Sequence, residues 1–249
     1  MEIRSESVQI PLQGGQQMGG HLARPTGPSG PGPFPGVIVW MEIFGVNGHI
    51  RDVTERVARE GYVALAPDFF HRSLPGAQLD YDDAGMAKGM QGLAALDADE
   101  MIQDARDALS FLRRQEGVGG KSGVMGFCIG GHMSYLTACE TDVAAAASFY
   151  GGGVAAPQGP GGKASTLSRT PGIRGRIICF FGGQDPMIDK PQVEAIRQAL
   201  ADAGTRSEVV VYDAATHGFF CDRRESFHPA SAADAWERVK ALFAEELRG

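Results

Sequence analysis

Residues 126–130 read Gly-Phe-Cys-Ile-Gly, and this segment constrains the fold more than any other part of the chain. Residues 121–127 predict a short buried strand, and residues 129–138 are compatible with a helix. A residue on a sharp strand-to-helix turn takes a strained backbone conformation, and its neighbours must lack side chains so that the helix packs closely on the sheet. The segment therefore predicts an exposed nucleophile at Cys128. For the isolated motif, an inert buried cysteine is the alternative.

Apolar runs and amphipathic segments alternate over most of the 249 residues, which is typical of a parallel sheet with helices on both faces. Residues 7–10 and 21–24 flank a glycine-rich turn and predict an N-terminal antiparallel hairpin. The length and the lack of an internal repeat favour a single domain over residues 1–249. Further strands are expected at residues 37–40, 62–66, 144–150, 176–181 and 208–212, and helices at 50–60, 99–114, 190–203 and 229–247.

Three segments lack a regular pattern. Residues 25–36 are rich in Pro, Gly and Ser and predict a loop. In residues 69–96, glycines at 76, 85, 89 and 92 are expected to interrupt any helix, and the segment is expected to border the substrate pocket. Residues 151–175 predict a long Gly/Pro-rich loop, and loops of this length are usually functional lids or mobile.

Composition excludes several classes of function. The net charge of −7 argues against nucleic acid or an anionic membrane as the main partner. No stretch approaches the roughly 18 apolar residues of a membrane span, and the N-terminus has no signal-peptide pattern. Four scattered cysteines without a Cys-x-x-Cys pair, and six histidines without ligand spacing, argue against disulfides and metal sites. We expect a cytoplasmic monomer or weak homodimer that acts on a small molecule without a metal or cofactor.

A thiol nucleophile needs a base, and the base needs an orienting acceptor. Asp185 follows the strand expected at residues 176–181, and His217 follows the strand expected at 208–212. Taken alone, Asp185 is compatible with a turn residue before proline, and His217 with a structural histidine. Their order after Cys128, each beyond a strand end, favours a catalytic triad.

The sequence resembles the dienelactone hydrolase family over nearly its whole length. Besides the three triad positions, the resemblance is carried by Glu-Ile-Phe-Gly-Val-Asn at 42–47, Pro-Asp-Phe-Phe at 67–70, Tyr-Gly-Gly at 150–152 and His-Gly-Phe at 217–219. It implies an α/β-hydrolase fold in which Glu42 accepts a proton from Cys128 once substrate arrives. By analogy with that fold, the backbone amides of Ile43 and Ile129 form the oxyanion hole. Without its neighbours, Glu42 is compatible with a surface residue at a strand end.

The expected reaction is cleavage of a small activated ester or lactone. The Cys128 thiolate attacks the carbonyl carbon, and His217, oriented by Asp185, activates the water that hydrolyses the acyl-thioester. A thiolate is itself a good leaving group, so activated esters such as enol lactones are favoured over alkyl esters. A general carboxylesterase or thioesterase on the same residues, and a redox-sensing protein that uses Cys128, are the alternatives.

The resemblance leaves the substrate open. Dienelactone hydrolases proper hold a substrate carboxylate with two arginines, one after the Pro-Asp strand end and one four residues beyond the histidine. The second position here is Cys221, and Arg223 and Arg224 lie further along. The candidate substrate-binding residues are Phe44, Arg72, Lys88, Tyr150, Phe219 and Arg223.

Overall fold

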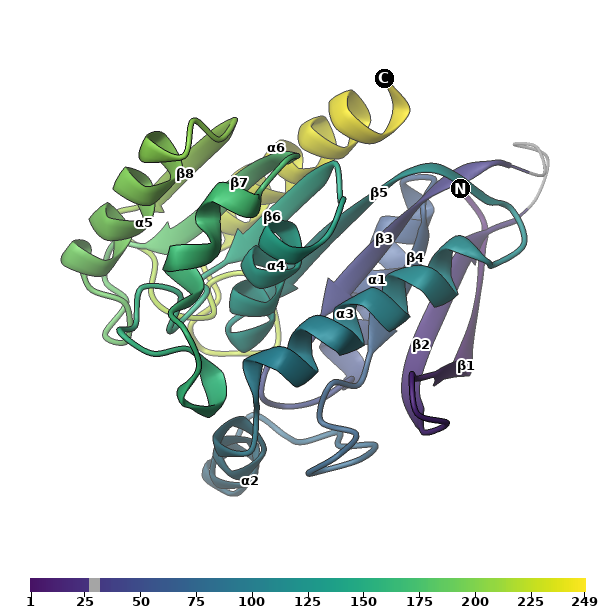
Figure 1. Cartoon of the computed structure of the whole chain (residues 1–249), viewed down its shortest axis with the longest axis horizontal. Coiled ribbons are helices and arrows are strands. Elements are labelled where there is room, and N and C mark those ends of the chain that lie inside the picture. The colour runs from purple at the N-terminus through teal and green to yellow at the C-terminus, as the bar shows by residue number, and fades with distance from the viewer. Residues whose placement is uncertain (27–31) are drawn as a thin grey trace.

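The computed structural model describes residues 1–26 and 32–249, and an eight-stranded sheet runs through its middle (Figure 1). β1 and β2 pair antiparallel, β2 pairs antiparallel with β4, and the remaining neighbours pair parallel. This confirms the expected α/β class, with a mostly parallel sheet and an N-terminal antiparallel hairpin. In spatial order the strands are β1 (Ile3–Pro11), β2 (Gln17–Pro25), β4 (Val63–Pro67), β3 (Phe34–Trp40), β5 (Val118–Phe127), β6 (Ala145–Phe149), β7 (Arg176–Gly182) and β8 (Ser207–Tyr212).

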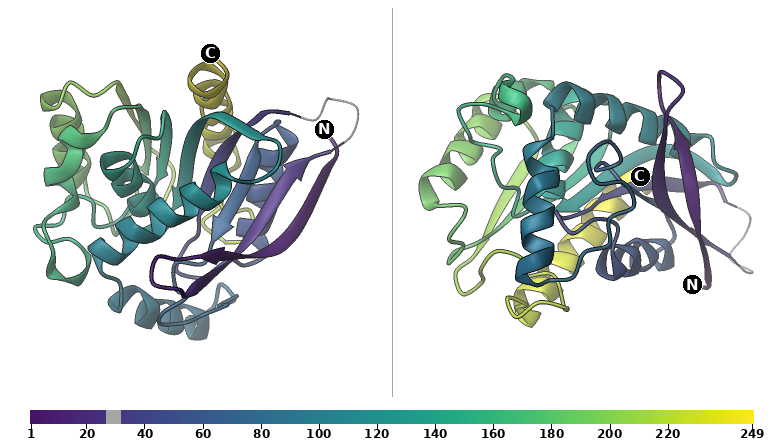
Figure 2. Two further views of the ribbon diagram at one scale, coloured as in Figure 1. Left: turned by 45° about the vertical axis from the view of Figure 1, so that its right-hand side comes forward. Right: turned by 90° about the horizontal axis from the view of Figure 1, so that it is seen from below.

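Helices cover both faces of the sheet, as Figures 1 and 2 show. On one face lie α1 (Gly48–Arg59) and α6 (Pro229–Arg248), and on the other lie α3 (Ala98–Arg113), α4 (Ile129–Glu140) and α5 (Lys190–Asp202). Polar side chains fix where several of these helices begin. The side chain of Asn47, for example, accepts hydrogen bonds from two backbone amides in the first turn of α1. Within the described residues, no helix combines the length and the apolar character that crossing a membrane requires.

The central strands are covered on both sides, which explains their continuous apolar sequences. All five residues of β4 and of β6 are buried. Beneath the carboxyl ends of the strands, aromatic rings pack on one another, with ring centroids 4.5 Å apart for Phe149 and Phe180 and 5.1 Å apart for Phe127 and Phe220. This packing gives the loops at that edge of the sheet a rigid base.

A helix that the sequence pattern does not predict, α2 (Asp83–Ala94), lies beyond the carboxyl edge of the sheet (Figure 1). Its glycines Gly85, Gly89 and Gly92 are buried. A Cβ on Gly89 would lie 2.6 Å from the carbonyl oxygen of Ile43, and one on Gly92 would lie 2.9 Å from the ring of Phe70. The expectation that these glycines interrupt a helix is wrong, because close packing against the body of the protein outweighs their poor helix propensity.

Parts of the other two irregular segments belong to regular elements. Pro25 ends β2, and Phe34 begins β3, so the loop expected at 25–36 is shorter than the sequence suggests; residues 27–31 lie outside the described part. Residues 151–175 are irregular apart from the short 3₁₀ helices Pro160–Gly162 and Thr166–Gly172. The second of these is joined to α4 by a buried hydrogen bond of 2.6 Å between the hydroxyls of Thr170 and Tyr135.

Candidate active site

Cys128 lies on the turn between β5 and α4 with φ 57° and ψ −121°, a conformation that costs a non-glycine residue energy. Its amide donates to the carbonyl of Phe149 at 3.0 Å, which anchors the turn to β6. A Cβ on Gly126 would lie 2.3 Å from the carbonyl oxygen of Gly130, and one on Gly130 would lie 2.4 Å from that of Met41. Both glycines are therefore required for α4 to begin this close to the sheet.

His217 and Asp185 come from the loops after β8 and β7 and meet beside this turn. Nδ1 of His217 lies 2.8 Å from Oδ2 of Asp185, and both side chains are almost fully buried. The other carboxylate oxygen of Asp185 accepts the backbone amides of Met187 at 2.8 Å and Ile188 at 3.3 Å. The carboxylate is thus held on both oxygens, and it orients the imidazole.

Two opposing effects act on the pKa of His217. Burial lowers it, but the hydrogen bond with Asp185 and the nearby Cys128 sulfur outweigh burial and raise the pKa well above its usual range. Nε2 makes no hydrogen bond of good geometry within the described part of the chain. The imidazole lines the same cavity as the thiol of Cys128 and is stabilised in its protonated form, as expected for a base that pairs with a thiolate.

Glu42 follows β3 and is completely buried, but its carboxylate is engaged by two partners. The hydroxyl of Tyr81 donates to one oxygen at 3.1 Å, and Nη1 of Arg224 donates to the other at 3.3 Å. The guanidinium of Arg224 also lies 5.6 Å from the ring centroid of Phe44 and 5.5 Å from that of Tyr81. Burial, followed by the charge of Glu42, raises the pKa of Tyr81, so its hydroxyl remains a donor.

The expected oxyanion donors and two aromatic candidates lie around the same turn. Neither the amide of Ile43 nor that of Ile129 donates to an acceptor in residues 1–26 or 32–249. Tyr150 has φ 37°, its ring lies 5.0 Å from that of His217, and its buried hydroxyl has no partner among the described residues. Phe219 is fully buried against Tyr150, with ring centroids 5.3 Å apart, and supports it from the core.

A cavity of about 450 Å³ opens beside Cys128 and His217. Its lining is mostly apolar and contains no Lys, Arg, Asp or Glu. The walls come from the turn between β5 and α4 that carries Cys128, called the elbow below, from the end of α2 and from the loop after β6. The lining residues are Leu93, Ala94, Leu96, Cys128, Ile129, His132, Gly152, Gly153, Ala156, Gln158, Gly159, Pro160, Gly161, Met187 and His217.

The structure does not bring the expected cations to this cavity. Arg72 forms a two-pronged ion pair with the buried carboxylate of Asp104, at 2.6 and 2.9 Å. Lys88 is exposed on α2, and Arg223 is exposed and covers Gly48 at the start of α1. The cation beside Glu42 is instead Arg224. In the sequence, Arg224 lies seven residues beyond His217. The family resemblance places an arginine four residues beyond the histidine, so the spacing alone did not single out Arg224.

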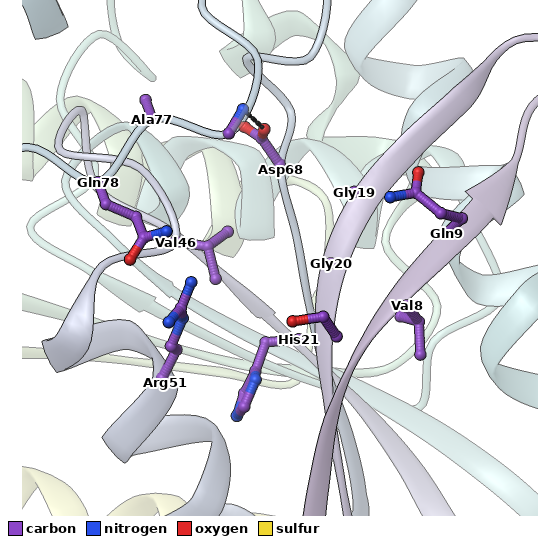
Figure 3. Close-up of a pocket in the computed structure, with 12 residues that line it drawn as sticks. Val8, Gln9, Gly19, Gly20, His21, Val46, Arg51, Asp68, Ala77 and Gln78 are labelled. Carbon is purple, nitrogen blue, oxygen red and sulfur yellow. Dashed lines mark hydrogen bonds between the residues drawn. The ribbon is translucent and has the colours of Figure 1, made fainter.

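A second, smaller cavity of about 180 Å³ lies between the β1–β2 hairpin, the first turns of α1 and residues 76–78. Figure 3 shows Arg51 and Gln78 on one side of it, with Gly20 and Val8 of the hairpin opposite. Cys128, His217, Asp185 and Glu42 are absent from its lining. This cavity is therefore separate from the chemistry at the elbow. In the part of the chain that the structure describes, no group of three or more His, Cys, Asp or Glu side chains is arranged to hold a metal ion.

Comparisons with known proteins agree with this architecture. The model of the "Dienelactone hydrolase family" matches residues 18–247. A provisionally named carboxymethylenebutenolidase of Synechocystis is 40% identical over 250 residues, covering 100% of this chain and 99% of the relative. The carboxymethylenebutenolidase of Pseudomonas putida is 28% identical, covering 94% of each chain.

The similarity extends to a solved structure. The crystal structure of a provisionally named dienelactone hydrolase from Klebsiella pneumoniae superimposes with a TM-score of 0.89 at 32% identity, covering 98% of this chain and 100% of that one. The family match spans both the elbow and the loops that carry Asp185 and His217. The chain belongs to the dienelactone hydrolase family and is a hydrolase that acts on lactone or ester bonds.

Proposed function

We propose that this hydrolase uses Cys128 as its nucleophile and cleaves small activated esters or lactones through an acyl-thioester. The observation that carries the proposal is the position of Cys128 on a strained turn beside His217, whose other ring nitrogen is hydrogen-bonded to Asp185. Strain at a functional turn persists only where the surrounding structure fixes it, and here two glycines and β6 do so.

In the proposed first half-reaction, the thiolate of Cys128 attacks the carbonyl carbon, and the oxyanion binds to the amides of Ile43 and Ile129. When the tetrahedral intermediate collapses, the bond to the ester oxygen breaks, and the alcohol or enol leaves with a proton from His217. In the second half-reaction, His217 takes a proton from water, which attacks the thioester. The sulfur is then released and the acid product leaves.

We propose that Glu42 generates the thiolate when substrate arrives, as the family resemblance implies. In the resting arrangement its carboxylate is bonded to Tyr81 and Arg224. It must therefore exchange one of these partners to take a proton from Cys128. A thiol that stays protonated between turnovers is protected from oxidation.

The test is turnover of p-nitrophenyl acetate combined with mass spectrometry of the protein. Cys128→Ala is expected to abolish turnover and the acetyl adduct, whereas His217→Gln is expected to accumulate the adduct because deacylation lacks its base. Cys139→Ala is the matched control, because Cys139 is a buried thiol on α4 outside the cavity lining.

Full turnover by Cys128→Ala would refute the proposal. If the Cys128 thiol is oxidised readily and the protein forms no acyl adduct, the redox-sensing alternative is favoured instead. Faster turnover of alkyl thioesters than of activated esters and lactones would favour a thioesterase.

A further inference from the structure

The cavity beside Cys128 is bounded on one side by the end of α2 and the turn that follows it. Leu93, Ala94 and Leu96 provide this wall. Leu93 is half-buried and Leu96 is almost completely buried. The wall presents hydrocarbon and no charge to the space in front of the sulfur.

Another part of the lining comes from the loop after β6 and from the loop after β7. Ala156, Pro160 and Met187 provide its side chains, and glycine backbone provides the rest. His132 also lines the cavity, but Nδ1 lies 2.9 Å from the carbonyl oxygen of Gly152, and Nε2 lies 2.7 Å from the hydroxyl of Thr166. Both of its ring nitrogens are thus engaged by the protein, so besides Cys128 and His217 the polar side chain of the lining that remains for a ligand is Gln158.

The arginine and carboxylate side chains near the thiol lie outside this lining, and the charge of His217, which lies within it, is balanced by Asp185. Arg224 is held against Glu42 and the ring of Phe44. A carboxylate placed in the cavity would lose its hydration, and the cationic side chain of the lining, His217, is already paired with Asp185, so this placement is unfavourable. An apolar chain would gain about fourfold in binding for each methylene that it buries.

We propose that this cavity binds the uncharged hydrocarbon chain of the acyl group, so that the preferred substrates are activated esters of apolar monocarboxylic acids. This inference rests on the proposed function and deepens it. The acyl side of the ester is favoured because Cys128, which bonds the acyl carbon, and Ile129, whose amide holds the oxyanion, both line the cavity. A volume of about 450 Å³ lies in the range typical of sites for small ligands.

The decisive measurement compares two p-nitrophenyl esters of the same shape. The 4-methylpentanoate ends in an isopropyl group, and the monoester of succinic acid ends in a carboxylate. We expect kcat/KM for the neutral ester to be at least about tenfold higher. From acetate to hexanoate, kcat/KM is expected to rise by about fourfold per methylene. A preference for the succinate monoester, or no dependence on chain length, would overturn the inference.

A pair of variants on α2 tests the wall itself. Leu93→Lys places a cation in the cavity and is expected to lower kcat/KM for the 4-methylpentanoate by about tenfold and to narrow or reverse the preference over the succinate monoester. Met90→Lys adds the same charge one turn earlier, at a residue that is exposed and outside the lining. It is expected to change neither kcat/KM for the 4-methylpentanoate nor the preference for this ester over the succinate monoester.

Binding without turnover separates this inference from the proposed function. Uncharged N-methyl alkanamides of increasing chain length are titrated by calorimetry. If affinity rises with length but acetate turnover does not depend on Cys128, the proposed nucleophile is wrong and the apolar subsite stands. If acetate turnover depends on Cys128 but neither affinity nor kcat/KM rises with length, the subsite is wrong and the proposed function stands. A rise in kcat/KM with the length of the alcohol in place of the acyl group also contradicts the assignment.

Discussion

His132 connects the elbow helix to the loop that forms one wall of the cavity, and its burial predicts a measurable dependence of stability on pH. The ring is fully buried on α4, between the carbonyl of Gly152 and the hydroxyl of Thr166. Burial lowers the pKa of His132 from 6.5 to about 4, although the hydrogen bond to Gly152 opposes part of this effect. The folded protein therefore keeps this imidazole neutral in mildly acidic solution.

Proton uptake decides whether acid raises or lowers the free energy of unfolding. Between pH 6.5 and about pH 4 the unfolded chain binds a proton at His132 that the folded protein does not bind, so acid favours unfolding. The difference between the two pKa values corresponds to about 3 kcal/mol of unfolding free energy, present above pH 6.5 and lost as the pH falls to about 4. The contribution of His132 to the slope approaches about 1.4 kcal/mol per pH unit.

Urea denaturation at several pH values, for the wild type and for His132→Asn, isolates this contribution. Asn keeps an amide donor for Gly152 but does not titrate, so the wild-type curve is expected to fall more steeply between pH 6.5 and 4. Thr166→Val is the control, because it weakens the same contact, keeps the imidazole and is expected to keep the steep slope. Parallel curves for the wild type and His132→Asn would refute the reasoning.

Three further predictions concern packing and charge, and denaturation and activity measurements check them. Gly130→Ala is expected to cost about 3 kcal/mol of unfolding free energy, because its Cβ would lie 2.4 Å from a backbone oxygen; a loss below ~0.5 kcal/mol would contradict this close packing. Tyr150→Phe is expected to leave stability unchanged or to raise it by about 1 kcal/mol, since the hydroxyl that it removes is buried without a partner in the described structure, and clear destabilisation would reveal one. Arg72→Ala is expected to cost about 2 kcal/mol by leaving the Asp104 carboxylate short of a partner, while kcat/KM for p-nitrophenyl acetate stays the same; lost activity at unchanged stability would return Arg72 to the substrate site.

The parts of the fold that the sequence predicts are those whose burial leaves a simple pattern. β3 and β4 are covered on both faces and appear as uninterrupted apolar runs, and β6 departs from this pattern only at Ser148. Helix α2 does not follow its local pattern, because its stability comes from backbone that packs against Ile43 and Phe70. Such a contact depends on a distant part of the chain and leaves no hydrophobic periodicity.

The same distinction applies to the site. Cys128, Asp185 and His217 each follow a strand, and the carboxyl ends of parallel strands meet at one edge of a sheet, so their proximity could be expected. Arg224 lies in the loop after His217, and only the path of that loop decides which of two adjacent arginines faces Glu42. The pairing of Arg72 could not be predicted, because its partner, Asp104, is a buried carboxylate on α3, where the sequence shows only a charged residue in an amphipathic helix.

The buried glycines of α2 limit which positions of this helix can change their amino acid during evolution. A Cβ added at Gly89 would first meet the backbone oxygen of Ile43, at 2.6 Å, and backbone has no rotamers, so repacking of side chains cannot relieve this contact. Leu93, Ala94 and Leu96, at the end of the helix and just after it, contact the cavity through side chains, so they are not limited by contact with backbone. Natural drift and directed evolution are therefore both expected to alter substrate preference at Leu93, Ala94 and Leu96 while the helix axis stays in place. A library confined to the half-buried Leu93 and the exposed Ala94 samples new specificities at little risk to the fold, whereas Leu96 belongs to the core.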